Sequence, residues 1–199
     1  MKTIGVTGPT GAGKTTVLQA LEGLGCVSVD CDALYHSLLD TSPTLPGELT
    51  ARFGKSILNS QGGIDRKALG KVVFADPAAL ADLNAISHRH ILERCRELSR
   101  QAEEAGANGI VFDAIALFES GLADACDVTL AVVAPVETRI RRIMARDAIG
   151  EDYARSRVAA QRENEYYVNL CDYVLTNEEG TSPEELTAQV LRLFSNILC

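Results

Sequence analysis

The sequence predicts an α/β protein built on a parallel sheet of five strands. Short runs rich in Val, Ile and Leu alternate with longer amphipathic segments, which is the pattern of strands joined by helical crossovers. The runs have the composition of strands buried on both faces. With 199 residues, 46% of them apolar, the chain suits one domain with a substantial core. The expected strands are Lys2–Thr7, Cys26–Asp30, Gly109–Asp113, Val128–Val133 and Tyr173–Thr176.

Two helices have clear boundary signals. The first is expected from Gly13 to about residue 24, where Gly25 can adopt the positive φ that closes a helix. The last is expected from Ser182 to about residue 196, with Ser182 as the N-cap and Pro183 in the first helical position. Local sequence therefore predicts where both helices begin and end.

The chain between the second and third strands is long. Residues 31–108 contain no convincing strand, and an ordinary crossover is much shorter. Pro43–Phe53 and Asp76–Ala105 have helical patterns, so we interpret this stretch as a helical insertion. A second helical segment follows the fourth strand at Val136–Asn164 and is rich in arginine. Its arginines are Arg139, Arg141, Arg142, Arg146, Arg155, Arg157 and Arg162.

Composition narrows the classes of function. The formal net charge of −8 and the pI near 4.9 speak against a protein that holds nucleic acid through a basic surface. The six cysteines form no CxxC pair, so we expect them to be reduced and mostly buried. No signal peptide is visible, and no apolar run reaches the roughly 18 residues that span a bilayer. We expect a cytoplasmic protein without nucleic-acid or membrane partners, and a monomer, with self-association left open.

Residues Gly8–Thr15, GPTGAGKT, fit the pattern GxxxxGK[ST] of a phosphate-binding loop. The motif directly follows an apolar strand and precedes a helix, as it must. Its backbone N–H groups can face phosphate oxygens at the positive end of that helix, while Lys14 reaches the β- and γ-phosphates of ATP and Thr15 binds Mg²⁺. The alternative is a glycine-rich turn. The predicted nucleotide contacts in this loop are Gly8, Gly11, Ala12, Gly13, Lys14, Thr15 and Thr16.

The second strand ends in two carboxylates, Asp30 and Asp32. Ligands of open α/β sheets bind beyond the carboxyl ends of the strands, so we expect these residues beside the γ-phosphate. Because consecutive strand residues point to opposite sides, Asp30 and Asp32 should share a side while Cys31 faces away. The pair can then accept a proton from a substrate hydroxyl and support Mg²⁺, and Asp32 is the candidate base. Alternatively, Asp32 caps the next helix.

The third strand ends in a single carboxylate, Asp113. This is the expected place for an acidic residue that organises Mg²⁺, although a turn aspartate is the alternative. The residues after it are Ala114, Ile115 and Ala116, which do not form the DxxG element of GTPases, and the chain contains no NKxD element. These observations speak against a GTPase.

Three arginines of the second helical segment, Arg139, Arg142 and Arg146, are spaced to share one helical face. A solvated face is the usual meaning of such a run. Phosphoryl transfer, however, needs cations that neutralise the γ-phosphate, and a hinged lid commonly delivers them. We therefore predict a lid in which Arg142 and Arg146 act catalytically together with Lys14.

Together these features predict a small kinase with a three-layer P-loop NTPase fold of the nucleoside monophosphate kinase type. The expected parts are a core of residues 1–32, 106–135 and 165–199, a helical acceptor-binding insertion at 33–105 and a lid at 136–164. Two alternatives stay open at this point: a kinase of another small acceptor, and a regulatory module that binds ATP without transferring phosphate. Acceptor-dependent release of ADP would separate them.

Over nearly its whole length, the chain resembles the dephospho-coenzyme A kinase family. The phosphate loop followed by Asp30-Cys31-Asp32 is similar to the family's loop and Asp-Ala-Asp element. The chain departs from the family at Arg89 and at Ala116, where the family usually has proline. Further similar stretches are Ala116–Leu122, Arg146-Asp147 with Arg157 and Gln161, Asp172–Asn177 with Gly180, and Asp65-Arg66 with Phe74.

The resemblance implies a reaction and further site residues. The γ-phosphate of ATP would be transferred to the ribose 3′-hydroxyl of dephospho-CoA, giving CoA and ADP in the last step of CoA synthesis, with Asp32 as the catalytic aspartate. Asn177 would lie near the adenine of ATP. Tyr166 and Tyr167 could stack on adenine or simply pack. Residues implied on the acceptor side are Asp32, Asp65, Arg66, His88, Leu117 and Glu119.

Overall fold

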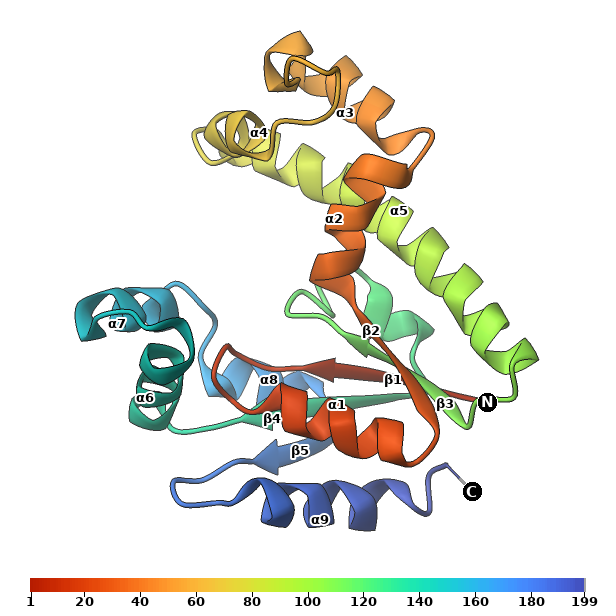
Figure 1. The fold of residues 1–199 in the computed structure, drawn as a ribbon, viewed down its shortest axis with the longest axis vertical. Helices are drawn as coiled ribbons and strands as arrows, with labels where there is room; N and C mark the ends of the chain where they lie inside the picture. The colour runs from red at the N-terminus through yellow and green to blue at the C-terminus, as the bar shows by residue number, and fades with distance from the viewer. Residues whose placement is uncertain (199) are drawn as a thin grey trace.

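The computed structural model describes residues 1–198 and contains one parallel sheet of five strands in the order β2-β3-β1-β4-β5 (Figure 1). All five predicted strands are confirmed with the predicted bounds. They are β1 (Lys2–Thr7), β2 (Cys26–Asp30), β3 (Gly109–Asp113), β4 (Val128–Val133) and β5 (Tyr173–Thr176).

The pairing register brings the carboxyl ends of three neighbouring strands together. Asp30 of β2 is paired with Asp113 of β3, and Asp113 is also paired with Val6 of β1. The phosphate loop leaves β1 immediately afterwards, at residue 8. The sheet therefore places the loop and both strand-end carboxylates at one edge, as the sequence predicts.

Helices cover both faces of the sheet. On one face, α1 (Lys14–Gly23) packs against α9 (Pro183–Phe194), and their apolar side chains form one core with β1 and β4. Gly25 has a φ of +84° and Ser182 forms a capping box, which confirms both predicted boundaries. On the other face, α5 (Pro77–Glu104) packs against β3, and α8 (Asn164–Leu170) packs against β4.

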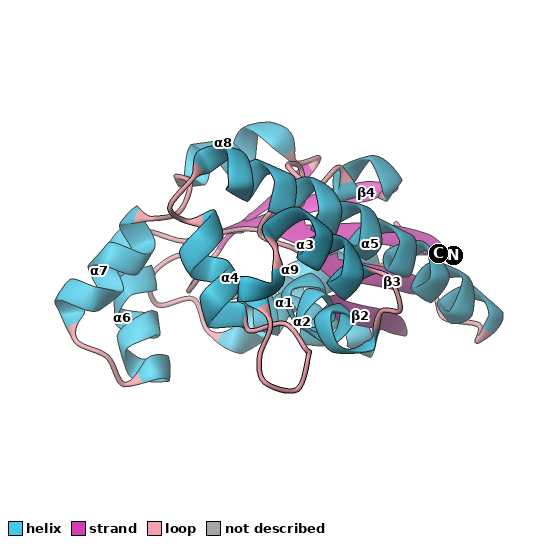
Figure 2. Cartoon of the chain, turned by 90° about the horizontal axis from the view of Figure 1, so that it is seen from above, coloured by secondary structure: helices cyan, strands magenta, loops and turns pink. Residues whose placement is uncertain are grey.

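The insertion has a core of its own. It consists of α2 (Cys31–Thr41), α3 (Leu45–Phe53), the 3-10 helix η1 (Lys55–Ile57), α4 (Arg66–Val73) and the first half of α5. Buried side chains from α2 to α5 form a separate apolar cluster that includes Leu39, Leu49, Leu69 and Ala79. Seen from above in Figure 2, α3, α4 and α5 lie over the sheet. The expected helical structure is present, with no named strand between Cys31 and Asn108.

The arginine-rich segment is a hairpin of two helices, α6 (Val136–Asp147) and α7 (Glu151–Ala159). The chain turns between them at Ala148, which has a φ of +52°. Ile140, Ile143, Ala154 and Val158 bury a small cluster between the two helices. The hairpin lies beyond the strand ends, beside the phosphate loop (Figure 1). A 3-10 helix, η2 (Leu122–Ala125), lies between β3 and β4.

Within residues 1–198, no helix is both long and apolar enough to cross a membrane. Five cysteines are free: Cys26, Cys31 and Cys95 are buried, and Cys126 and Cys171 are partly buried. These agree with the expectation of reduced, mostly buried thiols, while Cys199 lies outside the described residues.

Candidate active site

The phosphate loop is shaped by glycines in conformations that other residues rarely adopt. Gly8, Gly11 and Gly13 have φ angles of +138°, +82° and +106°. A Cβ on Gly8 would lie 2.0 Å from the carbonyl oxygen of Val132, so the loop backbone lies directly against β4. The loop ends at the N-terminus of α1, where unpaired backbone N–H groups and the helix dipole favour an anion.

A pocket of about 380 Å³ opens in front of this loop. Lys14 donates a hydrogen bond to the Gly8 carbonyl over 3.1 Å, and its Nζ lies 3.8 Å from Asp113 Oδ1. Thr15 is exposed at the start of α1. The pocket is lined by residues 9–15, Asp113, Arg142 and Arg146, so most of the predicted phosphate-handling residues lie together, while Gly8 and Thr16 are not part of the lining.

Asp113 carries a buried oxygen, Oδ1, that has no hydrogen-bond partner. The pKa of its carboxyl is raised to about 6, chiefly by burial; Lys14 lowers this pKa, and the charges of Asp30 and Asp32 raise it. A turn aspartate would instead bond to nearby backbone N–H groups. A carboxylate oxygen without a hydrogen bond, in the same pocket as an exposed hydroxyl, suits a hard cation such as Mg²⁺, so the chemistry of Asp113 and Thr15 fits the predicted metal role.

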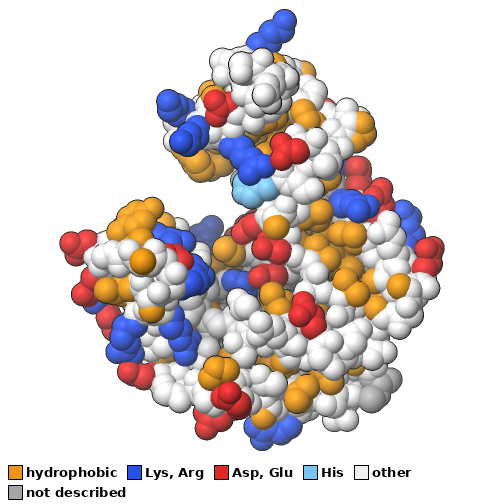
Figure 3. Space-filling view, in the orientation of Figure 1, with side chains coloured by type: hydrophobic (Ala, Val, Ile, Leu, Met, Phe, Trp, Pro, Cys, Tyr) orange, Lys and Arg blue, Asp and Glu red, His pale blue; other side chains and the backbone are white. Residues whose placement is uncertain are grey.

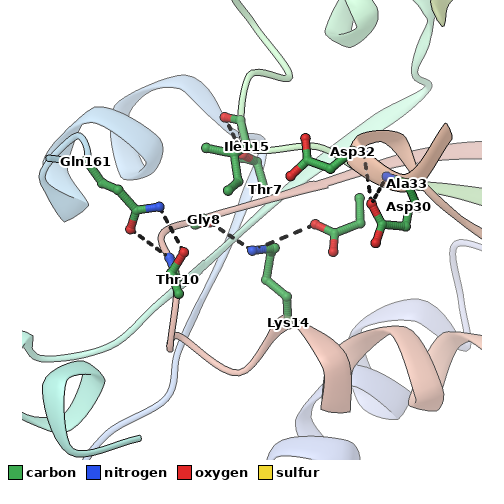
Figure 4. A network of polar contacts seen from close by, with 10 residues as sticks. Thr7, Gly8, Thr10, Lys14, Asp30, Asp32, Ala33, Ile115 and Gln161 are labelled. Carbon is green, nitrogen blue, oxygen red and sulfur yellow. Dashed lines mark hydrogen bonds and ion pairs between the residues drawn. The ribbon is translucent and has the colours of Figure 1, made fainter. Parts of the chain in front are cut away.

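Asp30 and Asp32 are not on one side of a strand, and this prediction is wrong. The strand stops at Asp30 and α2 begins at Cys31, so strand alternation does not apply. Asp30 is the N-cap: its Oδ1 accepts hydrogen bonds from the backbone N–H groups of Asp32 and Ala33, both over 2.9 Å. Figure 4 shows Asp30 held in this cap while the Asp32 carboxylate points toward Lys14. The cap therefore fixes Asp32 at the mouth of the site.

A second pocket, of about 200 Å³, lies between the end of β3 and the helices α2 and α5. Asp32, Tyr35, Asn84 and His88 contribute its polar lining. The linings of the two pockets are neighbours in sequence at the end of β3: Asp113 lines the phosphate pocket and the next residue, Ala114, lines this one. In Figure 3 the surface is deeply hollowed between the insertion and the lid, with charged side chains gathered at the base of the hollow.

The lid arginines do not share one environment. Arg142 and Arg146 line the phosphate pocket, as predicted. Arg142 donates to Asn177 Oδ1 over 3.1 Å, and Arg146 is paired with Asp147 at 2.7 Å. Arg139, from the same helical face, is only 1% exposed and donates to the Thr10 carbonyl instead of lining the pocket. A lid, rather than a solvated face, is the interpretation that the positions of Arg142 and Arg146 favour.

The acceptor-side residues implied by resemblance are scattered. His88 lines the second pocket, where burial lowers the pKa of its imidazole and nearby Glu119 opposes this shift. Leu117 is fully buried in the core under β3, so its predicted contact with substrate is corrected to a packing role. Asp65 caps α4, and Arg66 pairs with Asp40 at 3.1 Å; neither lines either pocket.

Both the nitrogen and the oxygen of the Asn177 side-chain amide are hydrogen-bonded within the protein. Its Nδ2 donates to the Ala12 carbonyl over 2.9 Å and its Oδ1 accepts from Arg142, so it supports the phosphate loop from below. Tyr167 is 1% exposed and has a packing role, while Tyr166 lies against the Arg162 guanidinium.

Several residues at the site were not predicted as pocket or loop contacts from the sequence. Tyr35 follows Asp32 by three residues and Asn84 precedes His88 by four, so helical spacing could have placed both beside predicted residues. No local signal links Gln161 to the phosphate loop. Its Oε1 nevertheless accepts from the Thr10 backbone N–H over 2.9 Å.

A phosphate loop at a strand–helix junction, with a second pocket nearby and a helical hairpin beside the loop, is typical of the P-loop kinases that phosphorylate small molecules, and this chain has their fold. It matches the dephospho-CoA kinase family model over residues 2–183, and the chain belongs to that family.

Individual relatives agree with this assignment. The dephospho-CoA kinase of Thermobifida fusca is 36% identical over 99% of this chain and 96% of its own length. That of Corynebacterium jeikeium is 40% identical, over 96% of each chain. A solved structure from Thermus thermophilus, 31% identical, superposes with a TM-score of 0.80 over 100% of this chain and 98% of the other. A shikimate kinase from Bacteroides thetaiotaomicron, 15% identical, shares the fold with a TM-score of 0.56, over 100% of this chain and 99% of the other.

Proposed function

We propose that the protein transfers the γ-phosphate of ATP to the ribose 3′-hydroxyl of dephospho-CoA and releases CoA and ADP. The observation that carries this proposal is the placement of two pockets at the end of β3, one lined by Asp113 and the other by the next residue, Ala114. A nucleotide held by the phosphate loop would point its terminal phosphate toward the pocket that Asp32 lines. The acceptor hydroxyl would then approach that phosphate from the side of the insertion.

In this mechanism Asp32 accepts the proton of the acceptor hydroxyl as its oxygen attacks phosphorus. Asp32 is exposed at the mouth of its pocket, and its backbone is fixed by the Asp30 cap. Lys14, Arg142 and Arg146 line the opposite side and neutralise the charge on the phosphoryl oxygens. Asp113 and Thr15 would hold Mg²⁺, which would supply positive charge to neutralise the phosphate oxygens.

The departures from the family pattern lie on the acceptor side. Arg89, at a usual proline position, forms an ion pair with Glu48 of α3, which also lies 3.3 Å from His90 Nε2. This contact ties α5 to α3 within the insertion. We infer that it replaces the rigidity of the missing proline and leaves the acceptor pocket formed. We also infer a monomer that acts in the cytoplasm, where free thiols such as those seen here persist.

The test measures ADP release from Mg²⁺-ATP with and without dephospho-CoA, with the product mass checked for one added phosphate. ADP that forms only with this acceptor, together with that mass change, supports the proposal. Release with another acceptor and not with dephospho-CoA would contradict it.

Replacing Asp32 with Asn tests the base. We expect kcat to fall about 100-fold or more while ATP binding, measured by calorimetry, stays within about threefold, because Asn keeps the shape but cannot take a proton. Glu22→Gln, an exposed change on α1 remote from the pockets, is the control. Full activity of the Asp32→Asn variant would remove Asp32 from this role.

A further inference from the structure

All three polar groups of Thr10, at the outer turn of the phosphate loop, are bonded to the lid segment. Its backbone N–H donates to Gln161 Oε1 over 2.9 Å, and its Oγ1 accepts from Gln161 Nε2 over 2.9 Å (Figure 4). Its carbonyl accepts from Arg139 Nε over 3.0 Å. Arg139 Nη2 also donates to Gln161 Oε1 over 3.1 Å, which closes a ring of four hydrogen bonds. We call Thr10, Arg139 and Gln161 the Thr10 clamp.

The clamp joins the two ends of the lid at one point. Arg139 lies in the first turn of α6, just after the chain enters the lid, and Gln161 follows α7, just before the chain leaves it. Between them, α6 and α7 share their own apolar cluster, so they can move as one body. Any hinge motion of this body starts from residues that are bonded to the phosphate loop.

Burying the charged side chain of Arg139 at this position is unfavourable for stability. Its side chain is 1% exposed, and the hydrogen bonds of its guanidinium go to neutral oxygens of Thr10 and Gln161. A buried charge without a counter-ion is costly, and an apolar side chain of similar volume is often better for stability alone. The phosphate loop also touches α6 directly, because a Cβ on Gly11 would lie 2.9 Å from the Arg139 carbonyl oxygen.

We propose that the Thr10 clamp is a positioning device for phosphoryl transfer: it sets the lid on the phosphate loop so that Arg142 and Arg146 meet the γ-phosphate. These two arginines follow Arg139 on the same helix by three and seven residues and line the phosphate pocket. Thr10, Arg139 and Gln161 act through them as positioning residues. This inference rests on the proposed kinase function and adds residues that phosphate chemistry alone does not require.

The test compares Gln161→Met, Thr10→Val and the double variant with the wild type. Met keeps the length of Gln without its hydrogen bonds, and Val removes only the Thr10 hydroxyl. We expect kcat for phosphorylation of dephospho-CoA to fall about 10- to 100-fold in Gln161→Met and less in Thr10→Val, because small misplacements of catalytic groups cost that much. KM for ATP should change by less than about threefold.

Two further readouts separate positioning from a merely structural role. The ratio of two rates should rise: the rate of ATP hydrolysis without acceptor divided by the rate of phosphate transfer to dephospho-CoA. The reason is that a misplaced lid excludes water poorly. The double variant should be no slower than Gln161→Met alone, since both changes break the same hydrogen bond between Thr10 and Gln161. Thr10→Ser, which keeps the hydroxyl, should have the wild-type kcat. Ser156→Ala is the matched control: it removes a lid hydrogen bond, to the Tyr153 carbonyl over 2.8 Å, that does not reach the loop.

The outcomes are distinct. Three outcomes would each overturn the clamp. The first is an unchanged kcat and an unchanged ratio of hydrolysis to transfer in both Gln161→Met and Thr10→Val. The others are additive effects in the double variant, and a rise in KM for ATP with no other change. If Gln161→Met does not fold, Thr10→Val and Thr10→Ser decide the question. A wild type that does not phosphorylate dephospho-CoA contradicts the proposed function, and the clamp is then judged from the hydrolysis rates of the same variants.

Discussion

Asp113 is subject to opposing electrostatic effects. Burial and the charges of Asp30 and Asp32 disfavour its ionised form, and Lys14 favours it. The first group prevails, so the pKa of this carboxyl is raised to about 6. A bound cation would reverse the balance by giving the buried oxygen a partner. The ionised form of Asp113 is therefore more favourable with a cation bound than without one.

The stability of the ligand-free protein should reflect this imbalance. Because the folded-state pKa of Asp113 lies above the ordinary 3.8, its carboxyl binds a proton more tightly in the folded than in the unfolded state. Its unfavourable contribution is absent below about pH 4 and grows as pH rises through 6. Asp113→Asn should thus raise the free energy of unfolding at pH 8 by up to about 3 kcal/mol, and by little near pH 4.

Urea unfolding of the nucleotide-free and metal-free protein at several pH values measures this difference, with exposed Asp124→Asn as the control. The same Asp113→Asn variant should lose most kinase activity, because an amide is a poor ligand for Mg²⁺. Equal stability of variant and wild type across the pH range would refute the assigned environment of Asp113.

At the scale of single elements, the N-cap of α2 links the stability of a helix to the position of a site residue. Its N-cap, Asp30, is the last residue of β2, and its first turn carries Asp32. The carboxylate of the cap accepts two backbone N–H groups, one of them from Asp32 itself. The orientation of the candidate base thus depends on a capping interaction.

Asp30→Ala should cost about 1 kcal/mol of stability, and it should also lower kcat because the first turn of α2 is no longer fixed. Asp30→Ser retains a capping oxygen and should restore most of both. Ser182→Ala breaks the capping box of α9, away from both pockets, and should reduce stability alone. Thermal melts together with steady-state rates provide both quantities, and an Asp30→Ser variant as slow as Asp30→Ala would mean that the carboxylate itself is required.

On the scale of the whole molecule, the insertion and the nucleotide-binding core bury separate apolar clusters. Leu49 is fully buried in the insertion cluster, and Val190 is fully buried in the cluster between α1, α9 and the sheet. The pocket proposed to bind the acceptor is lined by α2, α5 and the loop after β3, whereas the phosphate pocket is lined by the phosphate loop, Asp113 and α6. Damage to one cluster should therefore affect one substrate more than the other.

Leu49→Ala should destabilise the protein by about 2–5 kcal/mol and raise KM for dephospho-CoA more than KM for ATP. Val190→Ala is the matched change in the other cluster, and it should not raise KM for dephospho-CoA selectively. Initial rates with each substrate varied in turn test this at a temperature where both variants are folded. An equal rise of both KM values in Leu49→Ala would contradict a separate acceptor-binding insertion.

Features that depend on neighbours along the chain were predictable. The five strands, the glycines of the phosphate loop, the Ser182 cap and the end of α1 just before Gly25 follow from composition, spacing and allowed backbone angles. The kinase class and family followed from motifs of the same kind, and the family model confirms them. The assignment of Asp30 and Asp32 failed because two residues cannot reveal whether a strand continues or a helix begins.

The amino-acid sequence alone determined which segments form strands and helices, where the phosphate-loop motif lies and which family the chain belongs to, because motifs, local hydrogen bonding and hydrophobic periodicity depend on short stretches of sequence. Only the tertiary structure decided which arginines reach the phosphate pocket, that Leu117 is buried and that Gln161 is bonded to Thr10. Thr10 and Gln161 are 151 residues apart, and contacts at that separation depend on how whole elements pack. Packing depends on the complete set of side chains, so no short stretch of sequence contains it.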